Sequence, residues 1–464
     1  MKKNLLYLLL LSYALIAVFT IFYFDGTGDA GDSVLHFLYS KYAIQHPELY
    51  FNHWAKPFFV LLSSPFAQFG MRGMKFFNVL VILLTLVFTF KSVEELKLKN
   101  AYLSLLIIVF SPLTFILTFS GLTEPLFALM VSAGLFGYIK KEYIAPSLLL
   151  SFLPFVRSEG LIIIAIFGFF LMLKKQWKYL PLLLFGHLFY SIVGYWTYED
   201  LFWVFNKIPY NKMSSTYGKG ELFHFVEQLL YVVGVPIYLL FWLGVIELTR
   251  EALSKRINLE IHILVFLGFI TFFSAHTLFW YLGIFNSMGL KRVLIGIMPF
   301  ISIISVVGFN FLTERLLKNN KKLKNFFQVS IVAYILLFPF TPNPSAVNWN
   351  ENMSLSIEQK KATEVSRFMN QLSLNQEKLY YAHPYLSLAL KIDHFDSSRR
   401  MNLTMNYKEE IHKGDLIVWD YWFSVVEEAV SKEELDNNPN LQQIYTSKDK
   451  KTLFSVYRVI SITN

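Results

Sequence analysis

The chain has 464 residues, of which 55% are hydrophobic, 18% aromatic and only 16% charged, and its mean hydropathy is +0.44. Soluble globular proteins average about 25% charged residues, so the composition excludes an ordinary soluble domain and indicates a polytopic membrane protein. The net charge of +9 lies mostly in short clusters between apolar runs, as in membrane proteins, and we expect no nucleic-acid partner. The absence of cysteine excludes disulfides and thiolate metal sites.

Eleven apolar runs are candidate membrane-spanning helices, each of which needs about 20 mainly apolar residues. The first is longer than the roughly 7–15 apolar residues of a signal peptide and lacks a small-residue cleavage site, so we expect a retained helix. The fourth, fifth and sixth runs are short, which suits helices that are tilted, kinked or partly re-entrant. The approximate bounds are 4–24, 74–91, 101–119, 124–139, 143–157, 160–174, 178–198, 225–248, 260–279, 292–312 and 326–341.

Basic residues alternate along the chain, because every second loop between these runs is rich in lysine or arginine. The positive-inside rule then predicts a cytoplasmic N-terminus. The loops 25–73, 199–224 and 280–291 would face outward, together with the C-terminal tail.

The tail differs sharply in composition from the rest of the chain. A Pro/Asn/Ser linker, PNPSAVNWNENMS, is followed by a segment of helical periodicity, SIEQKKATEVSRFMNQL. Two buried strands, KLYYAH and DLIVWDYW, enclose a helix, PYLSLALKI, and a late alternating strand reads KTLFSVYRVI. We therefore expect a transmembrane domain of residues 1–341 and a small extracytoplasmic α/β domain of residues 342–464.

The first outer loop concentrates ionisable residues directly after the first span, where such groups are costly and commonly functional. A helix from Asp29 to about Gln45 would place Asp29, Asp32 and His36 on one face. His53 and Lys56 follow where the chain returns to the membrane. An ordinary solvated loop with an interfacial helix is the structural alternative. The apolar face expected at the membrane interface includes Val34, Leu38 and Tyr42.

Two further charged motifs lie at expected outer helix ends. Glu124 in GLTEP begins the fourth run, where a helix dipole also favours an acid. Arg157 and Glu159 in FVRSEG interrupt apolar sequence and could form an ion pair that stabilises a turn. All three are candidate substrate-binding residues, with these structural roles as alternatives.

Outward cations supply candidate anion sites. Lys291 and Arg292 stand at the N-terminus of the tenth run, against the positive-inside rule, in a position that suits an anion. Contact with anionic lipid headgroups is their alternative role. Lys219 lies between two glycines in YNKMSSTYGKGELFHF, a weak phosphate-binding pattern for which a plain turn is favoured.

Carboxylates in one outer loop and cations elsewhere on the same side suit the transfer of a group from a phosphate-linked donor. A carboxylate would take the proton of an acceptor hydroxyl, and cations would stabilise the departing phosphate. The pattern requires no cofactor, although Asp29 and Asp32 are also candidate ligands for a divalent metal ion.

The motifs GDAGDS, FSGLTEPLF and FVRSEG, many helices and an outward C-terminal domain together resemble the GT-C superfamily of polyprenyl-phosphate-dependent glycosyltransferases, especially its mannosyltransferase-like members. The resemblance implies inverting transfer of a sugar such as mannose to a hydroxyl of a lipid, glycan or protein, at the outer face of a bacterial inner membrane.

The resemblance further implies that Asp32 is the general base, with Asp29 beside it. It also implies that Lys291, Arg292 or Arg157 contacts the donor phosphate. Two residues separate Asp29 from Asp32, whereas protein mannosyltransferases have an adjacent Asp-Glu pair, so the acceptor class and the choice between the two aspartates stay open.

Two other functions compete with this interpretation. A transporter or flippase of a lipid-linked glycan would need polar residues along a path through the bilayer, whereas the strongest charges here lie at the expected outer boundary. A non-catalytic assembly or receptor protein would use the tail as its binding module.

Overall fold

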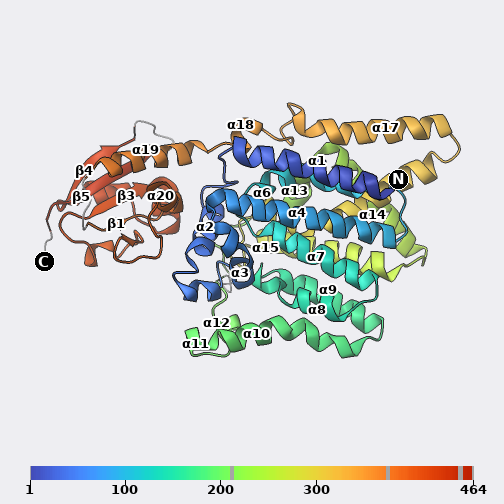
Figure 1. Cartoon of the computed structure of the whole chain (residues 1–464), viewed down its shortest axis with the longest axis horizontal. Helices are drawn as coiled ribbons and strands as arrows, with labels where there is room; N and C mark the ends of the chain where they lie inside the picture. Colours follow the sequence, from blue (N-terminus) through green and yellow to red (C-terminus); the bar gives the residue numbers. More distant parts are fainter. Residues whose placement is uncertain (1, 210–213, 373–376, 448–452, 462–464) are drawn as a thin grey trace.

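The computed structural model describes residues 2–209, 214–372, 377–447 and 453–461. Residues 210–213 of the second expected outer loop and residues 451–452 at the start of the last expected strand lie outside this description. The chain forms a bundle of roughly parallel helices with a smaller α/β domain at one end (Figure 1).

The bundle contains α-helices and short 3₁₀ or π helices, the latter two marked η. Its first half comprises α1 (Lys2–Tyr23), α2 (Asp32–Tyr42), η1 (Pro47–Phe51), α3 (Pro57–Ala67), α4 (Gly70–Glu95), α5 (Tyr102–Val109), α6 (Pro112–Thr118), α7 (Glu124–Ile139), α8 (Ile144–Ser151), η2 (Leu153–Phe155), α9 (Gly160–Leu173), η3 (Trp177–Leu184) and α10 (Phe185–Val193). Its second half comprises α11 (Tyr195–Tyr198), α12 (Trp203–Asn206), α13 (His224–Val233), α14 (Val235–Leu253), η4 (Glu260–Leu267), α15 (Gly268–Leu282), η5 (Lys291–Ile297), α16 (Met298–Asn310), η6 (Phe311–Leu316), α17 (Lys321–Leu337) and η7 (Phe338–Phe340).

Each of the eleven predicted spans coincides with a helical segment, and the architecture is that of an integral membrane protein. Within the described residues, five helical stretches are long and apolar enough to cross a membrane, namely Leu5–Tyr23, Gly70–Glu95, Glu260–Leu282, Lys291–Leu316 and Lys321–Phe340. The other six predicted spans are shorter, broken or more polar, so the count of eleven stays a prediction.

Proline and glycine break two of the predicted spans. The run 101–119 divides into α5 and α6 at Pro112, which has no N–H to donate and forces Ser111 into an extended conformation. The run 225–248 divides at Gly234, whose φ of 77° ends α13 before α14 begins. A Cβ atom at Gly234 would lie 2.4 Å from the ring of Phe338, so the break also allows a close approach to η7.

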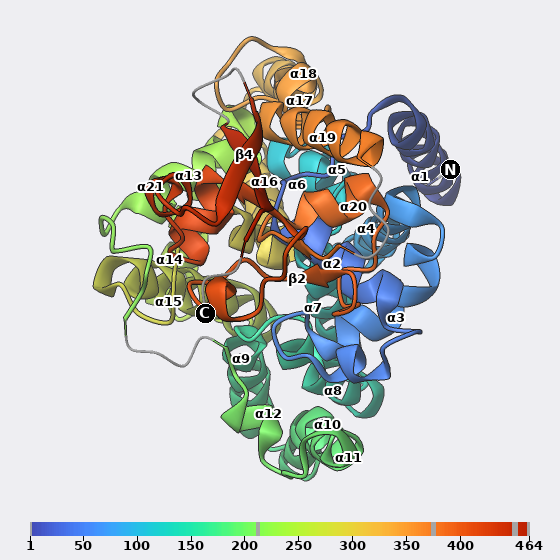
Figure 2. The ribbon, with the colours of Figure 1, turned by 90° about the vertical axis from the view of Figure 1, so that its left-hand side faces the viewer.

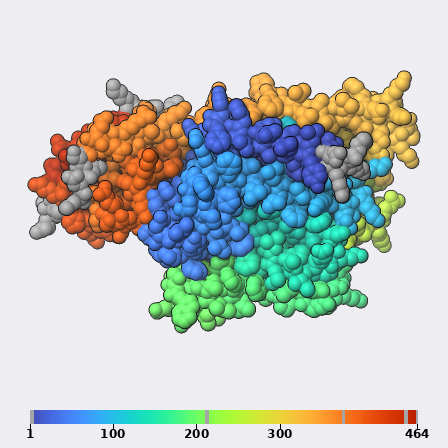
Figure 3. Space-filling model, in the orientation of Figure 1, coloured from blue at the N-terminus to red at the C-terminus, as the bar shows by residue number. Residues whose placement is uncertain are grey.

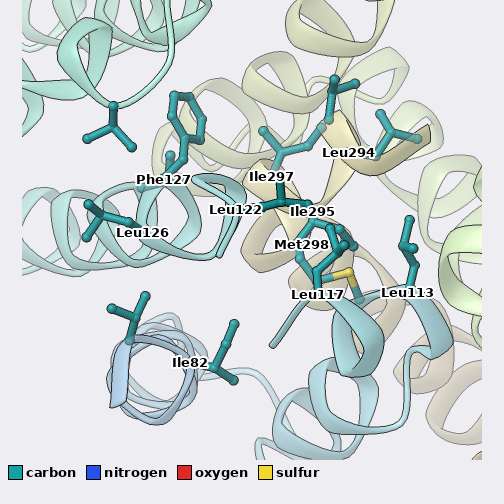
Figure 4. Close-up of a cluster of buried hydrophobic side chains, with 14 of the residues drawn as sticks. Ile82, Leu113, Leu117, Leu122, Leu126, Phe127, Leu294, Ile295, Ile297 and Met298 are labelled. Carbon is teal, nitrogen blue, oxygen red and sulfur yellow. The ribbon is translucent and has the colours of Figure 1, made fainter. Parts of the chain in front are cut away.

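The core of the bundle lies where α4, α6, α7 and the η5–α16 segment meet. Ile82, Leu117, Phe127 and Leu294 are buried there (Figure 4). The η5–α16–η6 stretch is almost entirely enclosed, whereas α1 and α17 lie at the periphery and expose most of their apolar side chains. Such large exposed apolar surfaces are typical of helices that contact lipid.

The chain after η7 contains a five-stranded sheet of order β2-β1-β3-β5-β4, and we call this part of the chain the C-terminal domain. The short β1 is parallel to β2 and β3, and β5 is antiparallel to β3 and β4. The central strand β3 is buried along its whole length. The strands are β1 (Leu379–Tyr380), β2 (Arg400–Met401), β3 (Leu416–Asp420), β4 (Leu441–Thr446) and β5 (Phe454–Val459), and the helices are α18 (Trp349–Asn352), α19 (Ile357–Gln371), α20 (Pro384–Leu390), η8 (Tyr407–Glu409), η9 (Tyr421–Glu427) and α21 (Lys432–Asp436).

This domain lies against the end of the bundle that carries α2 and α3 (Figures 2 and 3). Helix α2 begins at Asp32, three residues later than expected, and packs against α3, α4 and α20. Val34, Leu38 and Tyr42 are therefore buried inside the protein, and the prediction that they lie at the membrane interface was wrong. The apolar stripe of α2 is a face of the protein core.

Candidate functional site

The turn before α2 and the first residues of that helix position the two candidate carboxylates. Asp29 Oδ1 accepts hydrogen bonds from the N–H groups of Gly31 (3.0 Å) and Ser33 (2.8 Å). These groups lack partners at the start of a helix, so the Asp29 side chain stabilises the first turn. Asp32 is the first residue of α2, where the helix dipole favours a negative charge. His36 follows one turn later.

Arg292, in the first turn of η5, joins both aspartates to the start of α7. Its Nη1 donates to Asp29 Oδ2 at 2.6 Å, and its Nη2 donates to Asp32 Oδ2. Its Nε lies 3.3 Å from Oε1 of Glu124, whose side chain is 0% exposed. The candidate cation Arg292 and three candidate acids from distant parts of the sequence thus meet in one cluster, and α2, α7 and α16 lie behind the C-terminal domain at this end (Figure 2).

A second arginine shares Glu124. Arg157 Nη1 lies 2.7 Å from Glu124 Oε1, and Arg157 Nε donates to Glu159 Oε1 at 2.5 Å. His276 Nε2 lies 3.9 Å from the same Glu159 oxygen. A buried carboxylate is costly unless it is paired, and Glu124 is paired by both Arg157 and Arg292. Arg157 therefore forms ion pairs of the kind that the sequence offered as the structural alternative to substrate binding.

The two aspartates differ in how their oxygens are used. Asp29 uses both oxygens, one for backbone N–H groups and one for Arg292. The Asp32 side chain is 41% exposed, and within the described residues its Oδ1 accepts no hydrogen bond. Burial raises the pKa of Asp29 above its ordinary value. Burial also acts to raise the pKa of Asp32, but the charge of Arg292 opposes it, and the pKa of Asp32 is lowered, which keeps this carboxylate ionised at neutral pH.

The two candidate histidines are buried among aromatic rings. His36 stacks on Trp54 with ring centroids 4.9 Å apart, and burial lowers its pKa to about 3. His53 Nε2 donates to the carbonyl oxygen of Val204 at 3.0 Å, and burial lowers its pKa to about 4. Both rings are thus neutral at neutral pH. His36 borders the carboxylate cluster, whereas His53 packs against Trp203.

The two candidate lysines outside η5 have different environments. Lys56 is buried, and its Nζ donates to Ser158 Oγ at 2.9 Å, between Arg157 and Glu159 in sequence. Lys219 is exposed in its loop and forms no ion pair with the cluster among the described residues.

Lys56 should make the stability of the folded protein rise with pH in the alkaline range. Burial lowers its pKa from 10.5 to about 8, so between these values the unfolded chain binds more protons than the folded one. Raising the pH through this window therefore stabilises the folded state through Lys56. We expect the unfolding temperature in detergent to gain more between pH 7.5 and 9.5 in the wild type than in Lys56→Met. Exposed Lys360→Met should follow the wild type, and parallel curves for Lys56→Met and the wild type would contradict the prediction.

A cavity of ≈ 760 Å³ opens beside the cluster. Asp29, Lys291 and Arg292 line one side of it, with Tyr231 and apolar residues of α6. Lys291 Nζ lies 5.2 Å from the centroid of the Tyr231 ring. The linker 341–352 forms another wall, which sequence reasoning missed because a Pro/Asn-rich segment carries no pattern that specifies a binding surface.

A second, almost wholly apolar cavity of ≈ 180 Å³ lies among α1, α5 and η7. Trp349 of α18 lines both cavities, so the polar and apolar cavities adjoin at this residue. Tyr231 was not a candidate because a single aromatic residue in apolar sequence is usually a core residue. Trp349 was not a candidate because it lies in the Pro/Asn-rich linker.

The described residues contain no group of three or more histidine, aspartate or glutamate side chains placed to hold a metal ion. The two candidate metal ligands, Asp29 and Asp32, contact the guanidinium of Arg292 in this structure. Their positive counterpart here is thus an arginine.

No family model and no curated protein matches the sequence. In three dimensions the chain is similar to ArnT from Cupriavidus metallidurans, whose crystal structure was determined bound to undecaprenyl phosphate. The TM-score is 0.65 at 11% sequence identity, and the match covers 98% of each chain. Structural similarity at this sequence identity shows the fold, whereas the function has to be inferred from the residues of the site. The chain therefore has an ArnT-like fold.

Proposed function

We propose that the protein is a membrane glycosyltransferase that moves a sugar from a polyprenyl-phosphate donor to an acceptor hydroxyl. The observation that carries the proposal is the carboxylate of Asp32, which among the described residues keeps one oxygen free while the other accepts from Arg292, and Arg292 lines the larger cavity together with Lys291. The ArnT-like fold supports it, since ArnT was crystallised with a polyprenyl phosphate. From the motifs and the charge alternation we further propose a hexose such as mannose, a site on the outer face of a bacterial inner membrane and a cytoplasmic N-terminus.

In the proposed transfer, the Asp32 carboxylate acts on the acceptor and the cations of η5 act on the donor phosphate. Asp32 Oδ1 takes the proton of the acceptor hydroxyl as its oxygen attacks the anomeric carbon of the donor sugar. The bond between that carbon and the phosphate oxygen breaks, and the polyprenyl phosphate leaves with the electron pair. Lys291 and Arg292 stabilise the charge that develops on the phosphate. Attack opposite the leaving group inverts the anomeric configuration. Asp29 holds Arg292 and the first turn of α2 in place.

The adjoining cavities suit the two parts of such a donor. The ≈ 760 Å³ cavity offers Lys291 and Arg292 to a phosphate and α6 to apolar groups. The ≈ 180 Å³ cavity behind Trp349 is lined almost only by apolar side chains between the peripheral helix α1 and η7, where isoprene units can enter from lipid. Arg157 lines neither cavity, whereas Lys291 and Arg292 both line the larger one, so we assign the phosphate to the η5 pair.

Incubation of the purified protein with polyprenyl-phosphate sugars should test the function directly. We expect mass spectrometry to detect free polyprenyl phosphate and an acceptor heavier by one sugar, in equal amounts. Proteoliposomes give the contrasting result: movement of an intact lipid-linked glycan across the bilayer, with no release of lipid phosphate, would support a flippase and reject the transferase.

A further inference from the structure

The C-terminal domain contacts the turn that carries Asp29. Gln359 lies in the first turn of α19, and its side chain is nearly inaccessible, with 2% of the residue exposed. Its Nε2 donates to Thr27 Oγ1 at 2.6 Å and to the carbonyl oxygen of Asp29 at 3.3 Å. A residue more than 300 positions away in the sequence therefore holds the backbone of a candidate catalytic residue.

Thr27 connects Gln359 to the rest of the turn. Its Oγ1 donates to the carbonyl oxygen of Asp29 at 2.5 Å, and its own carbonyl oxygen accepts from Ser33 Oγ. Ser33 Oγ also accepts from the N–H of Gly121 at 2.9 Å, near the start of α7. The turn is thus fixed between the C-terminal domain on one side and the segment before α7 on the other.

Other contacts of the domain flank the same turn. The N–H of Gly26 donates to the carbonyl oxygen of Met353 at 3.0 Å, and a Cβ atom at Gly26 would lie only 2.4 Å from that oxygen. A Cβ atom at Gly31 would lie 3.1 Å from the ring of Phe423 in η9. Close packing at both ends of the turn leaves little room for it to move while the domain is in place.

The oxygen and the nitrogen of the Gln359 side-chain amide make different contacts. Its Oε1 accepts from the N–H of Ser356 at 3.0 Å, and Ser356 Oγ accepts from the N–H of Gln359 at 3.1 Å. This reciprocal pair is a capping box at the start of α19, for which glutamate serves as well as glutamine. The Nε2 group, which glutamate lacks, makes the contacts to Thr27 and Asp29.

We propose that Gln359 is a positioning residue of the active site. The C-terminal domain is required for the activity of that site because it fixes the turn that carries Asp29. The inference rests on the proposed function, since it assigns the domain a role in the same transfer. Gln359 acts through Thr27 and the Asp29 backbone, which orient the Asp29 carboxylate, Arg292 and hence Asp32.

Gln359→Glu separates the capping box from the contact with the turn. It keeps the acceptor for Ser356 and removes the donor for Thr27 and Asp29. We expect kcat to fall about 10- to 100-fold, as for a small displacement of a reacting group, with the donor KM changed by less than about twofold. Gln371→Glu, the same change at an exposed position of α19, should behave as the wild type.

Thr27→Val provides a second test that buries no new charge. It removes the shared hydroxyl while keeping the side-chain shape, and we expect a similar loss of kcat. The double variant with Gln359→Glu should lose little more than either single variant, because both changes break the same network. Hydrogen exchange of the peptide 25–33 should become faster in each variant while the unfolding temperature stays close to that of the wild type.

The outcomes distinguish this inference from the proposed function. If the wild type releases no lipid phosphate from any donor, the transferase fails, yet the exchange measurement still tests the contact. If peptide 25–33 exchanges equally in the wild type and both variants, or if an active wild type loses no kcat on either substitution, the positioning role is overturned. A loss of activity that only follows the folded fraction would also overturn it.

Discussion

Replacing Asp32 with asparagine is expected to lower kcat for sugar transfer by about 10²- to 10⁴-fold, the range for loss of a general base. Asparagine has nearly the same shape, and its oxygen can still accept from Arg292, so the cavity and the donor site should persist. What is lost is the free carboxylate oxygen that takes the acceptor proton. Transfer can be followed by release of polyprenyl phosphate, and donor binding by retention of the lipid-linked sugar on the immobilised protein.

Asp29→Asn decides between the two aspartates. Both Asp29 oxygens are already used by Gly31, Ser33 and Arg292, and an asparagine can keep the backbone contacts, so we expect a smaller loss of kcat than for Asp32→Asn. Asp200→Asn, in the loop after α11, should leave transfer unchanged because asparagine can still accept from the N–H of Phe202. A larger loss at position 29 than at position 32 would assign the base to Asp29.

The helical segments could be predicted because hydropathy is a local property of the chain. The run 124–139 coincides with α7, and the charge of Glu124 marked the end of that helix near the site. Hydropathy could not show that the apolar face of α2 meets protein instead of lipid, because lipid tails are as apolar as a leucine side chain. The burial of Val34 and Leu38 depends on α3, α4 and α20, which only the fold brings there.

The kinds of charge in the site could also be predicted, whereas the partners could not. Asp32 and Arg292 are 260 residues apart, and nothing local distinguishes Arg292 from Arg157 as the partner of the aspartates. Glutamine carries no charge or periodic signal, so Gln359, 332 residues from Thr27, could not be found from the sequence. Long-range pairing is a property of the packed fold, and short motifs indicate only which chemistry is present.

Arg292→Lys should have the second large effect, although it conserves the charge. The planar guanidinium donates from separate nitrogens to Asp29 and Asp32 and holds its Nε 3.3 Å from Glu124, whereas an ammonium is a point charge on a flexible stem. Lysine can therefore satisfy one of these acids while leaving the others less well held. We expect kcat to fall by about 10²- to 10³-fold, as for loss of a group that stabilises the transition state, with a weaker effect on folding because Arg157 still pairs with Glu124.

A control substitution and a double variant distinguish the orienting role of Arg292 from simple phosphate binding. Arg367→Lys, at an exposed position of α19, should leave kcat and the unfolding temperature unchanged. If Arg292 orients Asp32 in addition to binding phosphate, Arg292→Lys should lower kcat even with saturating donor and should add little to the loss in Asp32→Asn, because residues that act as a unit are not additive. Full recovery of kcat at saturating donor would reduce Arg292 to a binding residue, and additive losses would separate it from Asp32.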